Sequence, residues 1–145
     1  MIRKIKEADY PRLIEIWDSA VSHTHNFLVY EDFLYYKRQL TTYFQNMPLY
    51  GFEQHECLVG FMGVAEGNIE MLFIHNDYRG MGIGKKLISY AINTLRATRV
   101  DVNEQNTQAV GFYKHMGFSI TNRSALDADG KEYPILHMQL QPANE

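Results

Sequence analysis

A glycine-rich segment lies between a strand-like apolar run and a long amphipathic helical pattern. Residues 77–86 read Asp-Tyr-Arg-Gly-Met-Gly-Ile-Gly-Lys-Lys, the apolar run 69–74 precedes them, and the helical pattern 83–95 overlaps their end. Alternate glycines let the backbone turn sharply and approach a ligand closely. The first turn of a helix also presents N–H groups without internal partners, and the helix dipole adds about half a positive charge there. The segment is therefore predicted to cradle a phosphate, helped by Arg79, Lys85 and Lys86.

Apolar periodicity along the chain predicts the remaining elements. Helical spacing marks the ranges 10–22, 33–47, 83–95 and 106–115. Short apolar or alternating runs between turn signals mark the expected strands 2–5, 49–53, 57–65, 69–74, 99–103, 118–126 and 133–140. Asp9 is predicted to cap the first helix, and Asn106 is predicted to open and cap the fourth. The order predicts an α+β fold, layered α/β/α, with a mixed and mostly antiparallel sheet of about seven strands and about four helices on both faces.

Composition limits the classes of protein that remain. A chain of 145 residues, 46% hydrophobic and 21% charged, fits one folded domain over residues 1–145. The net charge of −3 supplies no positive field for nucleic acid or an anionic membrane. The apolar stretch 57–65 is too short to span a bilayer, and the amino-terminal residues contain no apolar signal segment. The single cysteine, Cys57, cannot form an intrachain disulfide, so we expect a cytoplasmic protein. The sequence leaves its oligomeric state, monomer or homodimer, open.

The spacing of the glycines decides between phosphate ligands. A P-loop needs a glycine where Arg79 stands and a Ser or Thr where Lys86 stands, and a dinucleotide fingerprint needs G-x-G-x-x-G instead of the G-x-G-x-G that begins at Gly80. The pattern Arg-x-x-Gly-x-Gly at Arg79, Gly82 and Gly84 instead resembles the loop with which the GNAT superfamily of N-acetyltransferases holds the pyrophosphate of coenzyme A. The alternative is a glycine-rich turn that only joins a strand to a helix.

A second segment strengthens the resemblance. Residues 106–118 match every fixed position of N-x-x-A-x-x-F-Y-x-x-x-G-F, another GNAT signature, and they follow Gly84 after one helix and one strand, as in that family. The resemblance implies a GNAT fold and acetyl-CoA as cosubstrate, with no metal. It also implies cofactor contacts from two groups of residues, namely Arg79, Gly80, Met81, Gly82, Ile83, Gly84 and Lys85 in the loop, and Asn106, Ala109 and Phe112 in the second motif.

The resemblance further implies catalytic roles. Tyr113 matches the family's general acid, whose hydroxyl protonates the departing thiolate. The run Leu72–Ile74 (Leu72, Phe73, Ile74) would pair through its backbone with the pantetheine arm, which adds to the sheet like a strand. Glu70 is the first candidate for the base that takes the proton of the amine, and we expect it to be partly buried with a raised pKa, because its neighbours are apolar. The alternative is that Glu70 points outward as a solvated strand residue. Glu104 is a second candidate for this role.

The segment between the first two helices is expected to form one wall of the acceptor site, as it does in GNAT folds. Here His25, Phe27 and Tyr36 are the predicted substrate contacts, and His25 is expected to titrate near neutral pH, where it could relay a proton. The alternative for His25 is a loop histidine held by a hydrogen bond. The pair His23 and His25 lacks further ligands, so a metal site is not predicted. In addition to the two motifs, this segment resembles that of one group of small bacterial GNAT proteins.

These features predict an N-acetyltransferase that moves the acetyl group from acetyl-CoA to a primary amine by direct attack in a ternary complex. Cys57 lies on an expected strand away from both motifs, with no basic neighbour to activate it, which argues against an acyl-enzyme. The alternative is a non-catalytic module that binds coenzyme A or an acyl-CoA as a sensor. The acceptor, a small molecule or a peptide, is left open by the sequence.

Overall fold

A computed structural model describes residues 1–142. In chain order the elements are β1 (Ile2–Lys4), the 3₁₀ turn η1 (Glu7–Asp9), α1 (Tyr10–Thr24), α2 (Tyr30–Gln45), β2 (Leu49–Gln54), β3 (Cys57–Ala65), β4 (Asn68–Ile74), η2 (Asn76–Tyr78), α3 (Ile83–Asn93), β5 (Arg99–Asn103), α4 (Thr107–His115), β6 (Phe118–Ser124) and β7 (Ile135–Leu140).

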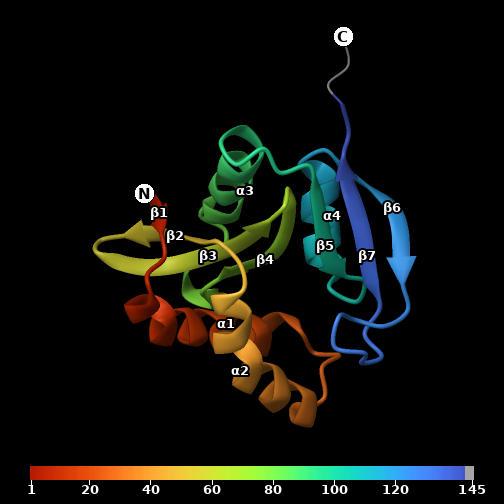
Figure 1. Ribbon diagram of the computed structural model, residues 1–145, viewed down its shortest axis with the longest axis horizontal. Helices are drawn as coiled ribbons and strands as arrows, with labels where there is room; N and C mark the ends of the chain where they lie inside the picture. Colours follow the sequence, from red (N-terminus) through yellow and green to blue (C-terminus); the bar gives the residue numbers. More distant parts are fainter. Residues whose placement is uncertain (143–145) are drawn as a thin grey trace.

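The strands form one mixed sheet in the order β1-β2-β3-β4-β5-β7-β6. Neighbouring strands are antiparallel except for β4 and β5, which are parallel. Figure 1 shows the sheet as two differently oriented halves, with β1–β4 on one side and β5, β7 and β6 on the other. The predicted α+β architecture, with a mostly antiparallel sheet and four α-helices, is confirmed.

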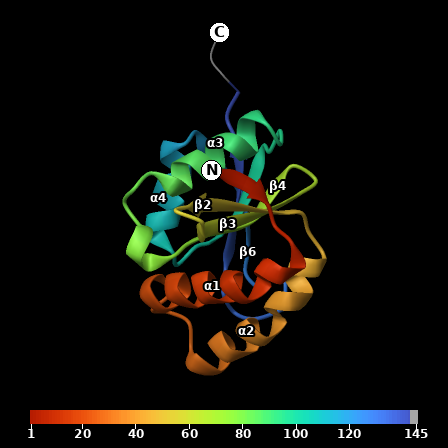
Figure 2. The ribbon, with the colours of Figure 1, turned by 90° about the vertical axis from the view of Figure 1, so that its left-hand side faces the viewer.

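The helices cover the two faces of the sheet separately. In Figure 2, α1 and α2 lie below the sheet, α3 lies above it, and α4 lies to its left. Two apolar clusters follow this division. One joins α3 and α4 to the sheet through residues such as Leu87, Val100 and Tyr113, and the other joins α1 and α2 to β2–β4 through residues such as Trp17 and Phe61.

The sheet opens where β4 meets β5. The two strands pair only at Asn68 with Arg99 and at Ile69 with Val100, although β4 continues to Ile74. Across the other edge of β4, Gly63 pairs with Met71 and Val64 with Ile69, so that Glu70 is the extra residue of a β-bulge. Such a bulge bends the strand that carries it. In the described chain, β4 beyond Glu70 therefore has β3 on one side and no strand on the other.

Some predicted boundaries differ from the structure. Asp9 precedes α1 without capping it, because its carboxylate binds Arg3 at 2.9 Å and the backbone N–H of Lys6 at 2.9 Å. The last two strands are shorter than expected, and residues 125–134 form a loop between them. Its side chains hold it to α2: Tyr36 bonds to Asp127, Tyr43 bonds to Asp129, and Lys131 lies 2.9 Å from Asp32.

Candidate active site

A cavity of about 850 Å³ passes through the opening between β4 and β5. Leu72 and Ile74 line it from the side of the core beneath α3, whereas Met71 and Phe73 line it from the side of α1 and α2. We call the part on the side of α3 and α4 the donor half. It is lined by Leu72, Ile74, Tyr78, Arg79, Gly80, Gly82, Ile83, Gly84, Lys85, Asn106, Gln108, Ala109, Phe112 and Tyr113. The acceptor half is lined by Ala20, Thr24, His25, Tyr36, Tyr43, Met47, Glu70, Asp101, Asn103, Ser124, Leu126, Asp127, Ala128, Asp129, Ile135 and His137.

The glycine loop forms one end of the donor half. Gly80 and Gly82 have positive φ angles of 77° and 79°, a conformation that L side chains rarely adopt. Gly82 is the N-cap of α3 and supplies no side-chain cap, and the first intrahelical bond runs from Lys86 N–H to Gly82. The N–H groups of the first turn are therefore available to an anion. Met81 is 57% exposed and, unlike the other predicted loop residues, does not line the cavity.

Helix α4 begins beside this loop. The Asn106 side chain accepts a hydrogen bond of 3.3 Å from Ala109 N–H, so the predicted capping role of Asn106 is confirmed. Gln108 accepts a bond of 2.6 Å from Arg79. The Phe112 ring packs close to Gly84, because a Cβ added to Gly84 would lie 3.7 Å from Cζ of Phe112. These contacts hold the two motifs together as one wall.

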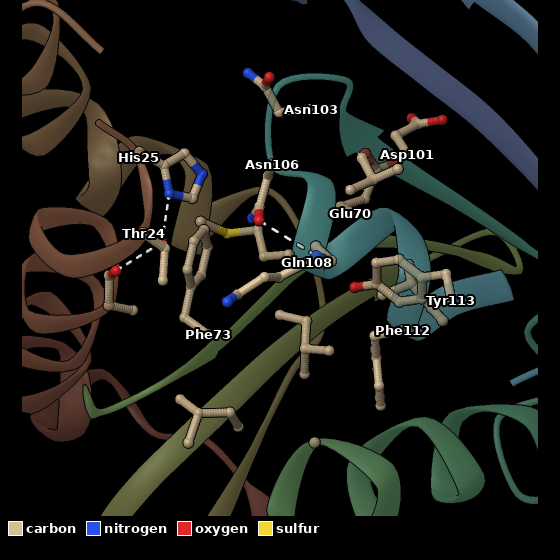
Figure 3. A pocket seen from close by; sticks show the side chains of 18 of the residues that line it. Thr24, His25, Glu70, Phe73, Asp101, Asn103, Asn106, Gln108, Phe112 and Tyr113 are labelled. Atoms are coloured by element: carbon tan, nitrogen blue, oxygen red, sulfur yellow. Dashed lines mark hydrogen bonds between the residues drawn. The ribbon is translucent and has the colours of Figure 1, made fainter. Parts of the chain in front are cut away.

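Tyr113 is buried at the end of this wall, with an exposed fraction of 5%. The rings of Phe112 and Phe118 lie edge-on to it at 5.4 and 5.9 Å. Figure 3 shows the Tyr113 hydroxyl pointing into the cavity. Burial raises the pKa of this phenol above its ordinary value. The hydroxyl therefore keeps its proton at neutral pH and is available as a donor.

Glu70 lines the cavity at the bulge of β4, but it is exposed, so the expected partial burial is wrong. The bulge interrupts the alternation of β4 at this position, and apolar sequence neighbours therefore do not bury it. Glu104 does not line the cavity, and its carboxylate forms an ion pair with Arg123 at 2.5 Å.

Of the three predicted acceptor contacts, two line the cavity and one does not. His25 lines the cavity, and its Nδ1 lies 2.7 Å from the Thr24 hydroxyl. Burial lowers the pKa of His25 to about 4, so the expectation that it titrates near neutral pH is wrong. Phe27 packs behind it, against His25 and Tyr133, and does not line the cavity. Tyr36 lines it and bonds to Asp127, and burial with this carboxylate raises the pKa of its phenol.

The sequence reasoning missed several polar residues of the acceptor half. Asp101 and His137 face one another across β5 and β7, Ser124 follows on β6, and Asp127 and Asp129 belong to the β6–β7 loop. Alternation along β5 could have placed Asp101 opposite the buried Val100 and Val102. The pairing of β5 with β7, which brings His137 beside Asp101, is a long-range contact without a local sequence signal.

In the part of the chain that the structure describes, no group of three or more His, Cys, Asp and Glu side chains is placed to hold a metal ion. Within residues 1–142, no helix combines the length and the apolar character that crossing a bilayer requires.

The cavity and its two motifs agree with a comparison to known families. Residues 19–141 match the family model described as an acetyltransferase (GNAT) domain. The chain belongs to the GNAT family. This GNAT protein is an N-acetyltransferase, and the two motifs recognised in its sequence together form one wall of the cavity.

Individual relatives of this GNAT chain agree with the assignment. It is 39% identical over 138 residues to the peptidyl-lysine N-acetyltransferase YjaB of Salmonella typhimurium, a match that covers 94% of this chain and 95% of that protein. The solution structure of apo-form YjaB from Escherichia coli superposes with a TM-score of 0.84 at 36% identity, covering 99% and 98% of the two chains. The acetyltransferase yncA of Salmonella typhimurium, solved with acetyl-CoA, has the same fold, with a TM-score of 0.63 at 21% identity, covering 100% and 95%.

Proposed function

We propose that the protein transfers the acetyl group of acetyl-CoA to the side-chain amine of lysine in a peptide or protein. The observation that carries the proposal is the continuous cavity through the opening of the sheet, with an uncapped helix start and cationic side chains at one end and carboxylates at the other. The chemistry of a negatively charged donor and a positively charged acceptor fits these two ends. We place the reaction in the cytoplasm, where a free Cys57 thiol stays reduced.

The donor half suits coenzyme A. The N–H groups at the start of α3, together with Arg79 and Lys85, match the charge of a pyrophosphate. Beyond Glu70, the free edge of β4 offers backbone groups to the pantetheine arm, as a strand would accept a neighbour. Leu72, Phe73 and Ile74 line the cavity along this edge, Phe73 from the side of α1 and α2, and one backbone N–H of this run would polarise the thioester carbonyl.

The chemical step is direct attack. The amine nitrogen forms a bond to the carbonyl carbon, the bond between carbon and sulfur breaks, and Tyr113 gives its hydroxyl proton to the departing thiolate. The proton that the nitrogen loses as the amide forms returns to the Tyr113 oxygen through water. The raised pKa of Tyr113 keeps this proton in place until the thiolate forms. The role of Glu70 is to attract the ammonium form of the acceptor and to accept its proton, directly or through water. Cys57 is exposed at the start of β3, outside the cavity lining, which supports a mechanism without an acyl-enzyme.

The charge of the acceptor half supports lysine as the acceptor. Glu70, Asp101, Asp127 and Asp129 line it, and no Lys or Arg does so in the described chain. Carboxylates at the mouth of a cavity raise the local concentration of a cationic substrate. The YjaB relatives are named as peptidyl-lysine N-acetyltransferases, which is the same chemistry.

Release of the coenzyme A thiol tests the proposal. The protein is incubated with acetyl-CoA and matched peptides that carry lysine, Nε-acetyl-lysine or norleucine at one position. Thiol release that needs the free lysine, together with mass spectra showing one acetyl group on that residue, is the expected result. Binding of acetyl-CoA by calorimetry without thiol release for any amine would instead indicate a non-catalytic binding module.

A further inference from the structure

The ring of His25 is held in one orientation at the end of α1. The backbone N–H of His25 donates to the carbonyl of Val21 at 2.9 Å, and its own carbonyl accepts from the N–H of Leu28 at 3.0 Å. Nδ1 of the ring lies 2.7 Å from the Thr24 hydroxyl, and the Phe27 ring packs against it with the centroids 5.1 Å apart. The orientation of the ring is therefore set by the protein and does not depend on a bound substrate.

The Thr24 hydroxyl determines which nitrogen of the His25 ring carries the proton. This hydroxyl has a single hydrogen, which it donates to the backbone carbonyl of Ala20 at 2.7 Å. Thr24 Oγ1 can therefore only accept from His25, so the proton of the neutral ring lies on Nδ1. Burial keeps the ring neutral, because it lowers the pKa of His25 to about 4. Nε2 is left with a lone pair and no hydrogen.

Nε2 of His25 is accessible from the cavity. Figure 3 shows this nitrogen turned away from Thr24 and into the cavity that His25 lines. Within residues 1–142, every side-chain nitrogen or oxygen that is shut off from solvent has a hydrogen-bond partner, whereas Nε2 has none and is therefore open to solvent. An N–H group of a bound substrate can reach this lone pair.

His25 differs from the charged acceptors of the same half of the cavity because its ring is neutral. Glu70, Asp101 and Asp127 present carboxylates there, and Asp127 already accepts the phenol proton of Tyr36. A carboxylate directly beside the reacting nitrogen stabilises its ammonium form, which has no lone pair with which to attack. A neutral imidazole can instead hold one N–H of the amine and leave the nitrogen free to lose a proton.

His25 and Tyr113 point into the cavity from opposite sides (Figure 3). In the mechanism above, the departing sulfur lies beside the Tyr113 hydroxyl, and the carbonyl carbon is bonded to this sulfur. An amine that attacks the carbon from the acceptor half therefore approaches on the side of His25. The ammonium form of lysine carries three hydrogens. Glu70 accepts the first, the second is lost as the amide forms, and the third stays on the amide nitrogen.

We propose that His25 orients the acceptor amine by accepting, at Nε2, the hydrogen that stays on the nitrogen when the amide forms. The proposal rests on the N-acetyltransferase function above. The bond to His25 aims the lone pair of the nitrogen at the carbonyl carbon, and it is kept in the amide product. His25 itself neither gains nor loses a proton. Thr24 is a positioning residue, because it fixes the ring proton on Nδ1.

Matched substitutions separate the two nitrogens of the ring. His25→Asn keeps a donor near the place of Nδ1 and has no acceptor near the place of Nε2, so kcat/KM for a lysine peptide should fall about tenfold, the effect of losing one hydrogen bond. His25→Gln carries an oxygen near the place of Nε2 and should recover most of this loss. His23→Asn, on the exposed part of α1 outside the cavity lining, is the control and should behave as wild type. Calorimetry should give the same affinity for coenzyme A in all of these proteins.

A methylated acceptor tests which hydrogen is held. The secondary ammonium of Nε-methyl-lysine carries two hydrogens, and both are lost when its amide forms, so none is left for His25. Wild type should therefore prefer a lysine peptide to the matched Nε-methyl-lysine peptide, and this preference should shrink about tenfold in His25→Asn. A preference that came only from the bulk of the methyl group would be equal in the two proteins.

NMR measures the tautomer without turnover. Long-range proton–nitrogen spectra identify the protonated nitrogen of each histidine ring, and the signals missing in His25→Asn belong to His25. Wild type and Thr24→Ser should show a bare Nε2, whereas Thr24→Val should let the proton move to Nε2 and should lose activity as His25→Asn does. Coenzyme A together with the lysine peptide should shift the Nε2 signal. Coenzyme A alone, or with the norleucine peptide, should leave the signal in place.

Three results would each overturn the role of His25. The first is a shift of the Nε2 signal with coenzyme A alone, which would assign the bond to an amide of the pantetheine arm. The second is equal kcat/KM in His25→Asn and His25→Gln, and the third is an equal preference for lysine in wild type and His25→Asn. All three leave the proposed function standing. Absence of thiol release by the wild type with every amine would refute that function, and the role of His25 with it.

Discussion

The guanidinium of Arg79 donates a hydrogen bond of 2.6 Å to Oε1 of Gln108 and thereby joins the glycine loop to the first turn of α4. The bond holds a cation beside the free N–H groups at the start of α3. We expect Arg79→Ala to weaken acetyl-CoA binding about tenfold, the effect of losing one bond to a charged group. Calorimetry should show a smaller difference at high salt. Arg38→Ala, an exposed change on α2, should leave affinity unchanged, and equal affinity in both variants would contradict the assignment.

Gly82 and Gly111 offer a matched pair of glycine substitutions. Neither position has an atom within 4 Å of an added Cβ, but only Gly82 has a positive φ, 79°. Gly82→Ala should therefore destabilise the fold by about 1 kcal/mol and weaken acetyl-CoA binding, because the strained loop moves. Gly111→Ala, in the interior of α4, should stabilise by about 0.5–1 kcal/mol. Thermal unfolding with and without acetyl-CoA measures both effects, and a stabilising Gly82→Ala would be inconsistent with the loop geometry.

Replacing Tyr113 by Phe removes only the hydroxyl. We expect kcat to fall by about 100-fold or more, because the thiolate must leave without a proton, while the affinity for coenzyme A stays close to that of wild type. The folded protein should keep its stability, because the phenyl ring still packs against Phe112 and Phe118. Steady-state kinetics and calorimetry with coenzyme A separate the two parameters. Unchanged turnover would remove Tyr113 from the mechanism.

His25 should make the fold sensitive to mild acid. Its pKa of about 4 in the folded state lies below the 6.5 of the unfolded chain, so the unfolded state binds more protons between these values. Stability is therefore full above pH 6.5 and falls as the pH drops toward 4, by roughly 2–3 kcal/mol. Urea unfolding of wild type and His25→Gln at pH 7 and pH 4.5 measures the loss. His23→Gln, on the exposed part of α1, is the control, and a pH-independent difference for His25→Gln would refute the expectation.

Cys57→Ser should leave turnover within about twofold of wild type, because the thiol is exposed at the start of β3, outside the cavity lining. Initial rates with acetyl-CoA and a lysine peptide check this. A large loss of rate, or a labelled thioester on Cys57, would favour a covalent mechanism over direct attack.

Local patterns predicted most of the fold. The strand 57–65 was expected with the bounds that β3 has, and the signature at 106–118 placed Asn106 as the cap of α4, because both depend on neighbouring residues. The bulge at Glu70 was not predictable, since it arises from the register of β4 against β3. The same holds for the bonds between α2 and the β6–β7 loop, which shorten the last two strands.

The donor half of the site was more accessible to sequence reasoning than the acceptor half. The glycine loop and the α4 motif are contiguous segments, so their residues could be named before their positions were known. The acceptor half is assembled from α1, α2, β4, β5, β6, β7 and the loop between β6 and β7, and residues such as Asp101 and His137 meet only through the pairing of β5 with β7. The depressed pKa of His25 likewise depends on tertiary burial.

The short pairing between β4 and β5 affects the stability of the whole protein. Only two residue pairs join these strands, fewer than join any other neighbours in the sheet. A molecule that lies along the open edge of β4 holds the two halves of the sheet together and supplies hydrogen bonds where β4 and β5 do not pair. Because it binds the folded chain alone, it shifts the folding equilibrium by mass action. The resistance of this enzyme to heat and proteolysis would then increase with the concentration of its own acetyl donor.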